Sequence, residues 1–200
     1  IMERRNNYAI AAAQARERFA GYDHEALARK LNIRLDEEYL YPVMLSHPYR
    51  IHRRTGDIFR LDGGEWVEAN GFDESLTLLD LVCDSRESRS ISGRWKNMSS
   101  FGHQFHQTLL ERADPWAQQL QEHPAALEAA CRALNAKKYP IGDIAYAIPL
   151  FEDLAILLKL TYGDDEFPAS VHWFWDENAL QYLKYETMYY ALGLLRSYLP

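Results

Sequence analysis

The clearest fold signal lies in residues 144–175, which read IAYAIPLFEDLAILLKLTYGDDEFPASVHWFW. Large apolar residues alternate with small or polar ones over residues 144–150 and again over residues 171–175, as in a strand with one buried face. A continuous apolar run over residues 154–162 separates these two segments. Because the connections between the three segments are short, we expect neighbouring strands to pair antiparallel.

Helices and a second meander are expected before this region. Apolar residues at helical spacing predict a helix over residues 8–19, and Asp23 is placed to cap a shorter helix that follows. Over residues 33–61 the pattern changes to the alternation that is typical of strands. Glycine-containing turns at residues 55–57 and 62–64 would join these strands into hairpins.

More helices are predicted in the rest of the chain. The leucine-rich residues 76–83 favour a helix, whereas the polar, serine-rich residues 85–100 favour an irregular loop. Pro115 and Pro124 each follow a polar residue and occupy the first turn of a predicted helix, where proline is well tolerated. Apolar residues at helical spacing over residues 188–199 predict a closing helix.

The order of these elements predicts an α+β fold, with an antiparallel sheet of two meanders packed with about five to six helices. We expect a single globular domain over residues 2–200, or a helix-and-meander lobe over residues 2–72 packed on residues 73–200. Ile1 precedes a methionine and is most simply explained as a remnant of cloning.

The composition excludes several classes of protein. The chain has 200 residues, of which 48% are hydrophobic, two cysteines and a formal net charge of −7. So many apolar side chains need a packed interior, which excludes disorder. The negative charge argues against nucleic-acid binding, and no apolar run reaches the ~20 residues of a membrane-spanning helix. We therefore expect a cytoplasmic protein that binds neither nucleic acid nor membranes.

The two cysteines also limit the cofactors. Cys83 and Cys131 lie within apolar patterns and lack the short paired spacing of a zinc or iron–sulfur ligand set. No glycine-rich nucleotide-binding motif is present either. The sequence thus predicts two buried free thiols and indicates no cofactor.

Five strings carry a resemblance to a known family: SGRW, GDIAYAIPLF, GDDEFP, WDENALQYLKYET and YALGLL, in that order. In combination they resemble an uncharacterised prokaryotic family, the domain of unknown function number three-seven-eight-six. Some relatives carry an amino-terminal cysteine-rich domain similar to that of the corrinoid iron–sulfur proteins of anaerobes. The resemblance therefore implies a link to such metabolism. This chain has no cysteine cluster, so an iron–sulfur role would have to be exercised through a partner.

The first candidate binding site is the basic stretch within the serine-rich segment. Arg94 stands next to Trp95, and this pair of residue types is enriched at binding hot spots. Residues 86–96 hold four basic side chains in an otherwise acidic chain. A protein partner with an acidic surface or a small anionic ligand could bind there. Equally, Trp95 could serve only to pin the loop onto the core.

The second candidate is an acidic loop between two predicted strands. Asp164, Asp165 and Glu166 place three carboxylates in succession. Such oxygen atoms suit a hard cation or a basic partner. The alternative is a plain acidic hairpin turn, which is favoured because calcium loops place their ligands at alternate positions.

Histidines supply a third, less specific candidate. His103 and His106 would lie on one side of a helix, where a pair of imidazoles can bind a metal. His172 lies on a predicted strand and could act as a general base with Asp176 nearby. Surface histidines and a hydrogen-bonded structural histidine are the simpler interpretations.

Two functional hypotheses follow. The leading one is a soluble, non-catalytic accessory or binding domain, serving corrinoid or iron–sulfur enzymes of anaerobic metabolism. Its recognition surfaces would be residues 86–106 and 164–166. The alternative is an enzyme of unknown reaction, whose site would form where the three histidines and the acidic loop converge.

Overall fold

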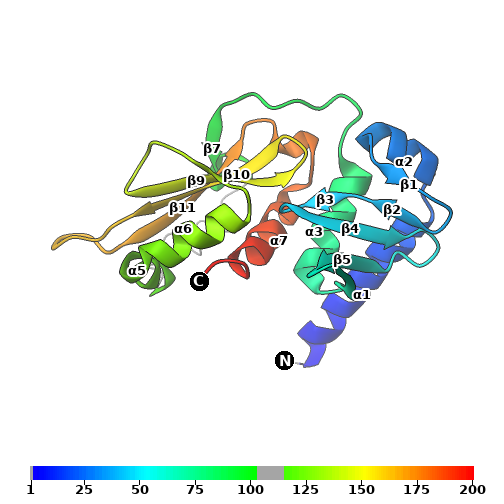
Figure 1. Cartoon of the computed structure of the whole chain (residues 1–200), viewed down its shortest axis with the longest axis horizontal. Coiled ribbons are helices and arrows are strands. Elements are labelled where there is room, and N and C mark those ends of the chain that lie inside the picture. The colour runs from blue at the N-terminus through cyan, green and yellow to red at the C-terminus, as the bar shows by residue number, and fades with distance from the viewer. Residues whose placement is uncertain (1, 103–114) are drawn as a thin grey trace. The chain divides into compact units, whose positions relative to one another are not determined.

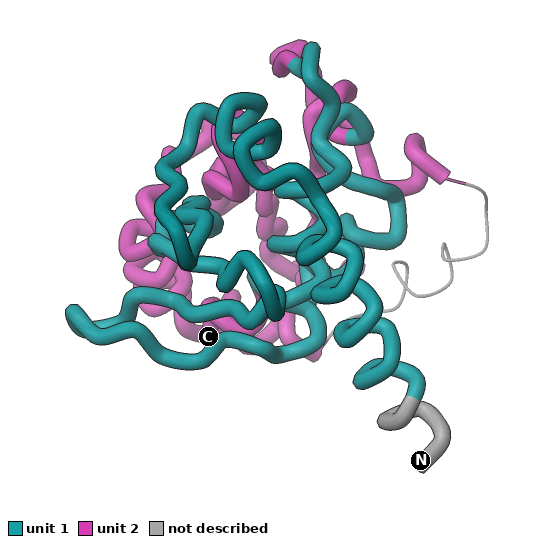
Figure 2. The backbone as a smooth tube through the Cα atoms, turned by 90° about the vertical axis from the view of Figure 1, so that its right-hand side faces the viewer, with its two compact units in different colours: residues 1–89, 180–195 teal, residues 90–179, 196–200 magenta. Residues whose placement is uncertain are grey.

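A computed structural model describes residues 2–102 and 115–200 of the chain. Within these residues the fold comprises six α-helices and two antiparallel sheets, which confirms the predicted α+β class (Figure 1). The chain divides into two compact units, of which the first holds residues 1–89 and 180–195 and the second holds residues 90–179 and 196–200 (Figure 2). No helix in the described residues is both long and apolar enough to cross a lipid bilayer.

The first unit combines four of these helices with a six-stranded sheet. The helices are α1 (Met2–Ala20), α2 (His24–Leu31), α3 (Phe72–Asp84) and α7 (Tyr185–Arg196), the last preceded by a 3-10 turn at Ala179–Gln181. The strands are β1 (Arg34–Leu35), β2 (Tyr39–Tyr41), β3 (Val43–Met44), β4 (His47–His52), β5 (Ile58–Asp62) and β6 (Glu65–Glu68). They are ordered β1-β2-β4-β5-β6, with β3 paired to β4. This unit contains the predicted lobe but also takes in α3 and α7.

Local sequence explains where these elements begin and turn. The Asp23 carboxylate accepts a hydrogen bond from the Ala26 amide at 2.9 Å and so caps α2, as predicted. Gly56 has φ +73°, and a Cβ there would lie 2.7 Å from the backbone oxygen of Arg16 in α1. Only glycine suits both the left-handed turn between β4 and β5 and this close approach. Gly63 and Gly64 make the next turn, with φ of +56° and +89°.

One face of this sheet forms the core against α3. Leu40, Ile51 and Ile58 on this face are fully buried. From the same face, the Tyr49 hydroxyl and the Arg60 guanidinium donate hydrogen bonds to Glu74 of α3 at 2.7 and 2.5 Å. The opposite face of the sheet is the outer face of the unit.

The second unit consists of a five-stranded sheet and two helices. The strands are β7 (Trp95–Asn97), β8 (Lys137–Lys138), β9 (Ile144–Phe151), β10 (Leu154–Thr161) and β11 (Ser170–Asp176), and a 3-10 turn at Met98–Ser100 follows β7. The helices are α5 (Pro115–Glu122) and α6 (Pro124–Ala133). The strand order is β7-β11-β10-β9-β8, and all pairs are antiparallel. The meander predicted over residues 144–175 is confirmed.

The register shows which residues share a face of this sheet. Leu158 pairs with Trp173 on one side and with Tyr146 on the other, so the three side chains lie on the same face. The ring of Trp116 in α5 stacks on Trp173 with centroids 6.1 Å apart. The helices α5 and α6 therefore cover this face (Figure 1). His172, one position along the strand, lies on the opposite face.

The prediction of an irregular loop over residues 85–100 was partly wrong. Residues Trp95–Asn97 form the edge strand β7, which pairs with Phe174–Asp176 at the end of β11. A strand of three residues has too few positions for its alternation to be recognised. Its strand conformation depends on hydrogen bonds to a partner about eighty positions away.

Candidate functional site

One buried carboxylate fixes the loop before β7 to the end of β11. Asp176 is only 3% exposed and accepts hydrogen bonds from the backbone amides of Ser92, Gly93 and Asn178 at 3.0, 2.8 and 2.8 Å. The Ser92 hydroxyl donates a fourth hydrogen bond at 3.2 Å. Burial alone would raise the pKa of Asp176, but these hydrogen bonds outweigh it and lower the pKa. Asp176 is therefore a buried anion held by amides.

The residues around Asp176 complete this link. Gly93 has φ +77°, a backbone conformation that other residues rarely adopt. The Glu177 amide donates a hydrogen bond to the Arg94 carbonyl at 2.8 Å, and the Asn178 side chain donates one to the Ser90 carbonyl at 3.0 Å. Two motifs that are far apart in the sequence thus meet. We call residues 92–95 and 175–178 together the SGRW–WDEN cluster.

The cluster places its two candidate binding residues differently. The side chain of Arg94 is 71% exposed, and its Nε donates a hydrogen bond to Glu177 at 2.6 Å. The Lys96 ammonium lies 3.7 Å from the other oxygen of Glu177. Trp95 is half-buried and meets the ring of Tyr139 edge-on, with centroids 6.0 Å apart. Arg94 is thus presented to solvent, while Trp95 is anchored within the unit.

The acidic loop is a tight turn between β10 and β11. The Asp164 carboxylate accepts hydrogen bonds from the amides of Phe167 and Glu166 at 2.8 and 2.9 Å, and these bonds lower its pKa. The Asp164 side chain therefore shapes its own turn. Asp165 and Glu166 are exposed, and the side chain of Phe167 is 68% exposed. The loop presents two carboxylates and an aromatic ring.

Replacing Gly163 with alanine is expected to weaken this hairpin. A Cβ at residue 163 would lie 2.6 Å from the backbone nitrogen of Ala169 and 3.1 Å from the carbonyl oxygen of Phe167. Backbone atoms cannot swing aside, so the hairpin must distort. We expect G163A to lower the free energy of unfolding by about 1–2 kcal/mol in urea denaturation.

The matched control is Gly21→Ala, where the new Cβ would meet only ordinary contacts at 3.5 and 3.7 Å. It should change stability by no more than about 0.5 kcal/mol. Equal effects of the two substitutions would show that the close approach at Gly163 does not matter.

The candidate histidines are not brought together in the part of the chain that the structure describes. His103 and His106 lie outside the described residues. His172 on β11 pairs across the sheet with Lys159 on β10. Partial burial and the charge of Lys159 lower the pKa of His172, which leaves its imidazole neutral at pH 7. Asp176, its predicted acidic neighbour, uses both carboxylate oxygens to hold the loop of Ser92.

The two thiols are buried and unreactive. Cys83 and Cys131 are both free, and burial raises the pKa of each to about 12. A thiol with such a pKa is protonated at neutral pH and is a poor nucleophile and metal ligand. Within residues 2–102 and 115–200, no three His, Cys, Asp or Glu side chains gather in a way that could hold a metal ion.

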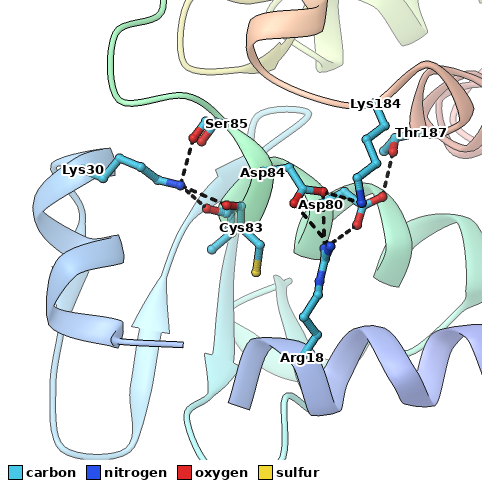
Figure 3. A network of polar contacts seen from close by, with 9 residues as sticks. Arg18, Lys30, Asp80, Cys83, Asp84, Ser85, Lys184 and Thr187 are labelled. Carbon is cyan, nitrogen blue, oxygen red and sulfur yellow. Dashed lines mark hydrogen bonds and ion pairs between the residues drawn. The ribbon is translucent and has the colours of Figure 1, made fainter. Parts of the chain in front are cut away.

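A network of charged side chains connects three helices of the first unit (Figure 3). Arg18 of α1 donates hydrogen bonds to Asp80 and Asp84 of α3 at 2.8 and 3.2 Å. From the other side, the Thr187 hydroxyl of α7 donates to Asp80 at 2.7 Å, and the Lys184 ammonium lies 3.1 Å from Asp84. Both carboxylates therefore have cationic partners, and we interpret the network as a structural link.

Lys30 has a similar structural role at the end of α3. Its ammonium donates hydrogen bonds to the carbonyl oxygens of Val82, Cys83 and Ser85 at 2.9, 3.2 and 3.0 Å (Figure 3). The last turn of α3 has no basic residue of its own. A cation from α2 therefore satisfies carbonyl groups that a helix end leaves without partners.

The sequence interpretation missed a group of aromatic side chains on the outer face of the first sheet. Tyr39, Phe59 and Trp66 lie around Arg50, and Tyr41 contacts the ring of Trp66. All five side chains are half-buried. The alternation over residues 33–61 predicts strands, but it does not show which face of the sheet is exposed. The signal that could have revealed the group is the recurrence of aromatic and basic residues at every second position.

Comparison with known proteins gives a family and nothing finer. The model of a family described as "Domain of unknown function (DUF3786)" matches residues 23–197. No curated protein and no solved structure is significantly similar to the chain. The matched range includes both halves of the SGRW–WDEN cluster and the acidic loop.

Proposed function

Because the chain belongs to the domain-of-unknown-function family DUF3786, we propose that it is a non-catalytic accessory domain that binds a partner protein through the SGRW–WDEN cluster. The observation that supports this most is the Asp176 carboxylate, whose four hydrogen bonds hold the loop in one conformation. A loop that is ordered in advance loses less entropy when it binds. Arg94 is then presented in a defined position.

The proposed partner has an acidic surface. Arg94 and Lys96 share one carboxylate, that of Glu177, so the three side chains together carry an excess positive charge. An exposed guanidinium can donate further hydrogen bonds to a carboxylate of the partner. The acidic loop at Asp164–Glu166 is the second proposed recognition surface, for basic groups of the same or another partner.

The proposed partner belongs to corrinoid or iron–sulfur metabolism. The support is the resemblance to relatives that carry a cysteine-rich domain. The burial of Cys83 and Cys131 agrees with this division of roles, because any metal cluster would have to be held by the partner's own thiolates.

We expect substitution of Arg94 by glutamate to weaken capture of this partner strongly. The wild-type chain, used as bait in a native anaerobic lysate, should retain an acidic protein whose eluate contains iron or cobalt. R94E should retain it at least about tenfold less, because charge reversal adds repulsion to the lost attraction. Metal analysis of the eluates gives the measurement.

The matched control is R132E on α6. Arg132 is also exposed and also paired with a glutamate, Glu128, but it lies outside the cluster. R132E should capture the partner as the wild type does. Equal capture by R94E, or an eluate without iron or cobalt, would contradict the proposal.

The alternative proposal is an enzyme that uses His172 as a base. Its support is the lowered pKa of this histidine, which keeps the imidazole able to accept a proton. Elemental analysis separates the two proposals. A metal that co-purifies with the chain and is lost in a variant lacking His103 and His106 would favour the enzyme.

A further inference from the structure

We propose that the outer face of the six-stranded sheet binds a small aromatic carboxylate and that Arg50 pairs with its carboxylate group. The register places Arg50 of β4 directly beside Phe59 of β5, and Trp66 of β6 beside Leu61. Because side chains alternate between faces, Arg50, Phe59 and Trp66 share the face turned away from α3. This inference concerns the first unit and does not depend on the function proposed for the SGRW–WDEN cluster.

Aromatic rings surround the guanidinium of Arg50 on this face. Its central carbon lies 4.5 Å from the ring centroid of Tyr39, 4.9 Å from that of Trp66 and 5.0 Å from that of Phe59. Contacts of this kind stabilise a cation through the negative faces of the rings. Ring faces supply no conventional hydrogen-bond acceptor for the N–H groups at the edge of the guanidinium.

The hydrogen bonding of Arg50 is incomplete. Its Nε is buried and has no hydrogen-bond partner among the described residues. Arg34 provides the contrast on the same sheet, because it lies 4.2 Å from the ring centroid of Tyr41 and also pairs with Asp36 at 3.1 Å. Arg53 likewise pairs with Glu25 at 2.6 Å. A buried donor without an acceptor is costly, so a carboxylate that draws the guanidinium outward and accepts its hydrogen bonds gains affinity.

The charge of the site favours a carboxylate over a phosphate. A carboxylate matches the fork of a guanidinium with two parallel hydrogen bonds. Asp36 accepts a hydrogen bond from Tyr41. Glu68 lies opposite Phe59 in the register of β5 and β6. Two acidic side chains therefore lie near this face. Arg34 on this face is already paired with Asp36, so the charge of Arg50 suits a single negative charge better than the two charges of a phosphate ester.

The rings set the size and kind of the rest of the ligand. They come from β2, β5 and β6, and β4, which carries Arg50, lies between β2 and β5. Neighbouring strands lie about 4.8 Å apart, so the surface spans roughly 14 Å. This is the length of two or three fused rings with a short acidic arm. Half-buried tyrosine, phenylalanine and tryptophan rings favour flat aromatic partners in edge-on or offset contact.

The test uses three naphthalene probes on the full chain: 2-naphthoate, 2-naphthyl phosphate and the uncharged 2-naphthalenemethanol. We expect calorimetry to show that the wild type binds 2-naphthoate more tightly than the other two. R50Q should weaken the binding of 2-naphthoate at least about tenfold. The affinity of R50K should lie between those of the wild type and R50Q, because lysine keeps the charge but loses the fork. R34Q is the matched control and should bind like the wild type.

A second measurement locates the bound probe. Trp66 is the only tryptophan in residues 1–89, and its indole N–H signal in the NMR spectrum can be assigned with W66F. This signal should shift on addition of 2-naphthoate to the wild type and to R34Q. Circular dichroism establishes that R50Q and R50K are folded.

Several results would overturn the proposal. They are absence of 2-naphthoate binding by the wild type, equal binding by folded R50Q, and equal or tighter binding of the alcohol or the phosphate. Self-association of the chain that depends on Trp66 would identify a second copy as the occupant. A peptide ending in tryptophan that binds much more tightly than 2-naphthoate would identify a peptide instead.

Discussion

Replacing Asp176 with alanine is expected to lower the free energy of local opening around residues 92–95 by about 3 kcal/mol. The substitution removes the acceptor of three backbone amides and one hydroxyl. Because Asp176 is 3% exposed, water cannot easily take its place. Hydrogen exchange of the Ser92, Gly93 and Asn178 amides, followed by NMR, measures the effect directly.

The control for this prediction is Asp164→Ala. Asp164 also accepts hydrogen bonds from two backbone amides, but in an exposed turn where water can replace the carboxylate. Its loss should cost no more than about 1 kcal/mol. If the Ser92 and Gly93 amides exchange as slowly in D176A as in the wild type, Asp176 does not hold the loop.

The same carboxylate should make the loop sensitive to acid. The pKa of Asp176 is lowered from its ordinary value of 3.8 in the folded chain. Its contribution to stability is therefore fully present above pH 3.8 and is lost as the pH falls toward the folded pKa. In D176N the exchange of the same amides should be faster, and its dependence on pH below 3.8 should be weaker.

The strands β9 and β11 of the second unit could be predicted because their residues alternate over eight and seven positions. The clustering of Ser92 with Asp176 could not be predicted in this way. The two residues are linked by hydrogen bonds between positions 84 apart, and nothing near either residue indicates the other. The two motifs are separate strings in the sequence, and only the fold shows that they form one cluster.

The outer face of the first sheet could not be predicted from the sequence, for a different reason. Alternation assigns residues to two faces but does not say which face is buried. Here Leu40 and Ile51 on one face and Tyr39 and Phe59 on the other are all apolar, so both faces look like core. Only the packing of α3 against the face of Tyr49 shows that the aromatic residues lie outside. That placement also puts Arg50 on the outer face, beside Phe59.

Replacing Asp80 with alanine is expected to lower the free energy of unfolding by about 2 kcal/mol. The change leaves the Thr187 hydroxyl without its acceptor and removes one of the two carboxylates that pair with Arg18. The loss is smaller than for a fully buried ion pair, because Asp84 still pairs with Arg18 and the Arg18 side chain is 34% exposed. Urea denaturation followed by circular dichroism gives the measurement.

Two comparisons make this prediction specific to the network. D62A removes a 66% exposed carboxylate that lies 3.9 Å from Arg60, and it should cost less than about 0.5 kcal/mol. The pH dependence should also be opposite to that of Asp176. Burial raises the pKa of Asp80, so protonation favours the folded state, and its contribution increases as the pH falls through the folded pKa toward 3.8. The D80A variant should therefore lack the relative gain in stability that Asp80 gives as the pH falls. The D176A variant should instead lack the loss of stability that protonation of Asp176 causes. An equal cost for D80A and D62A would mean that the network does not hold α1, α3 and α7 together.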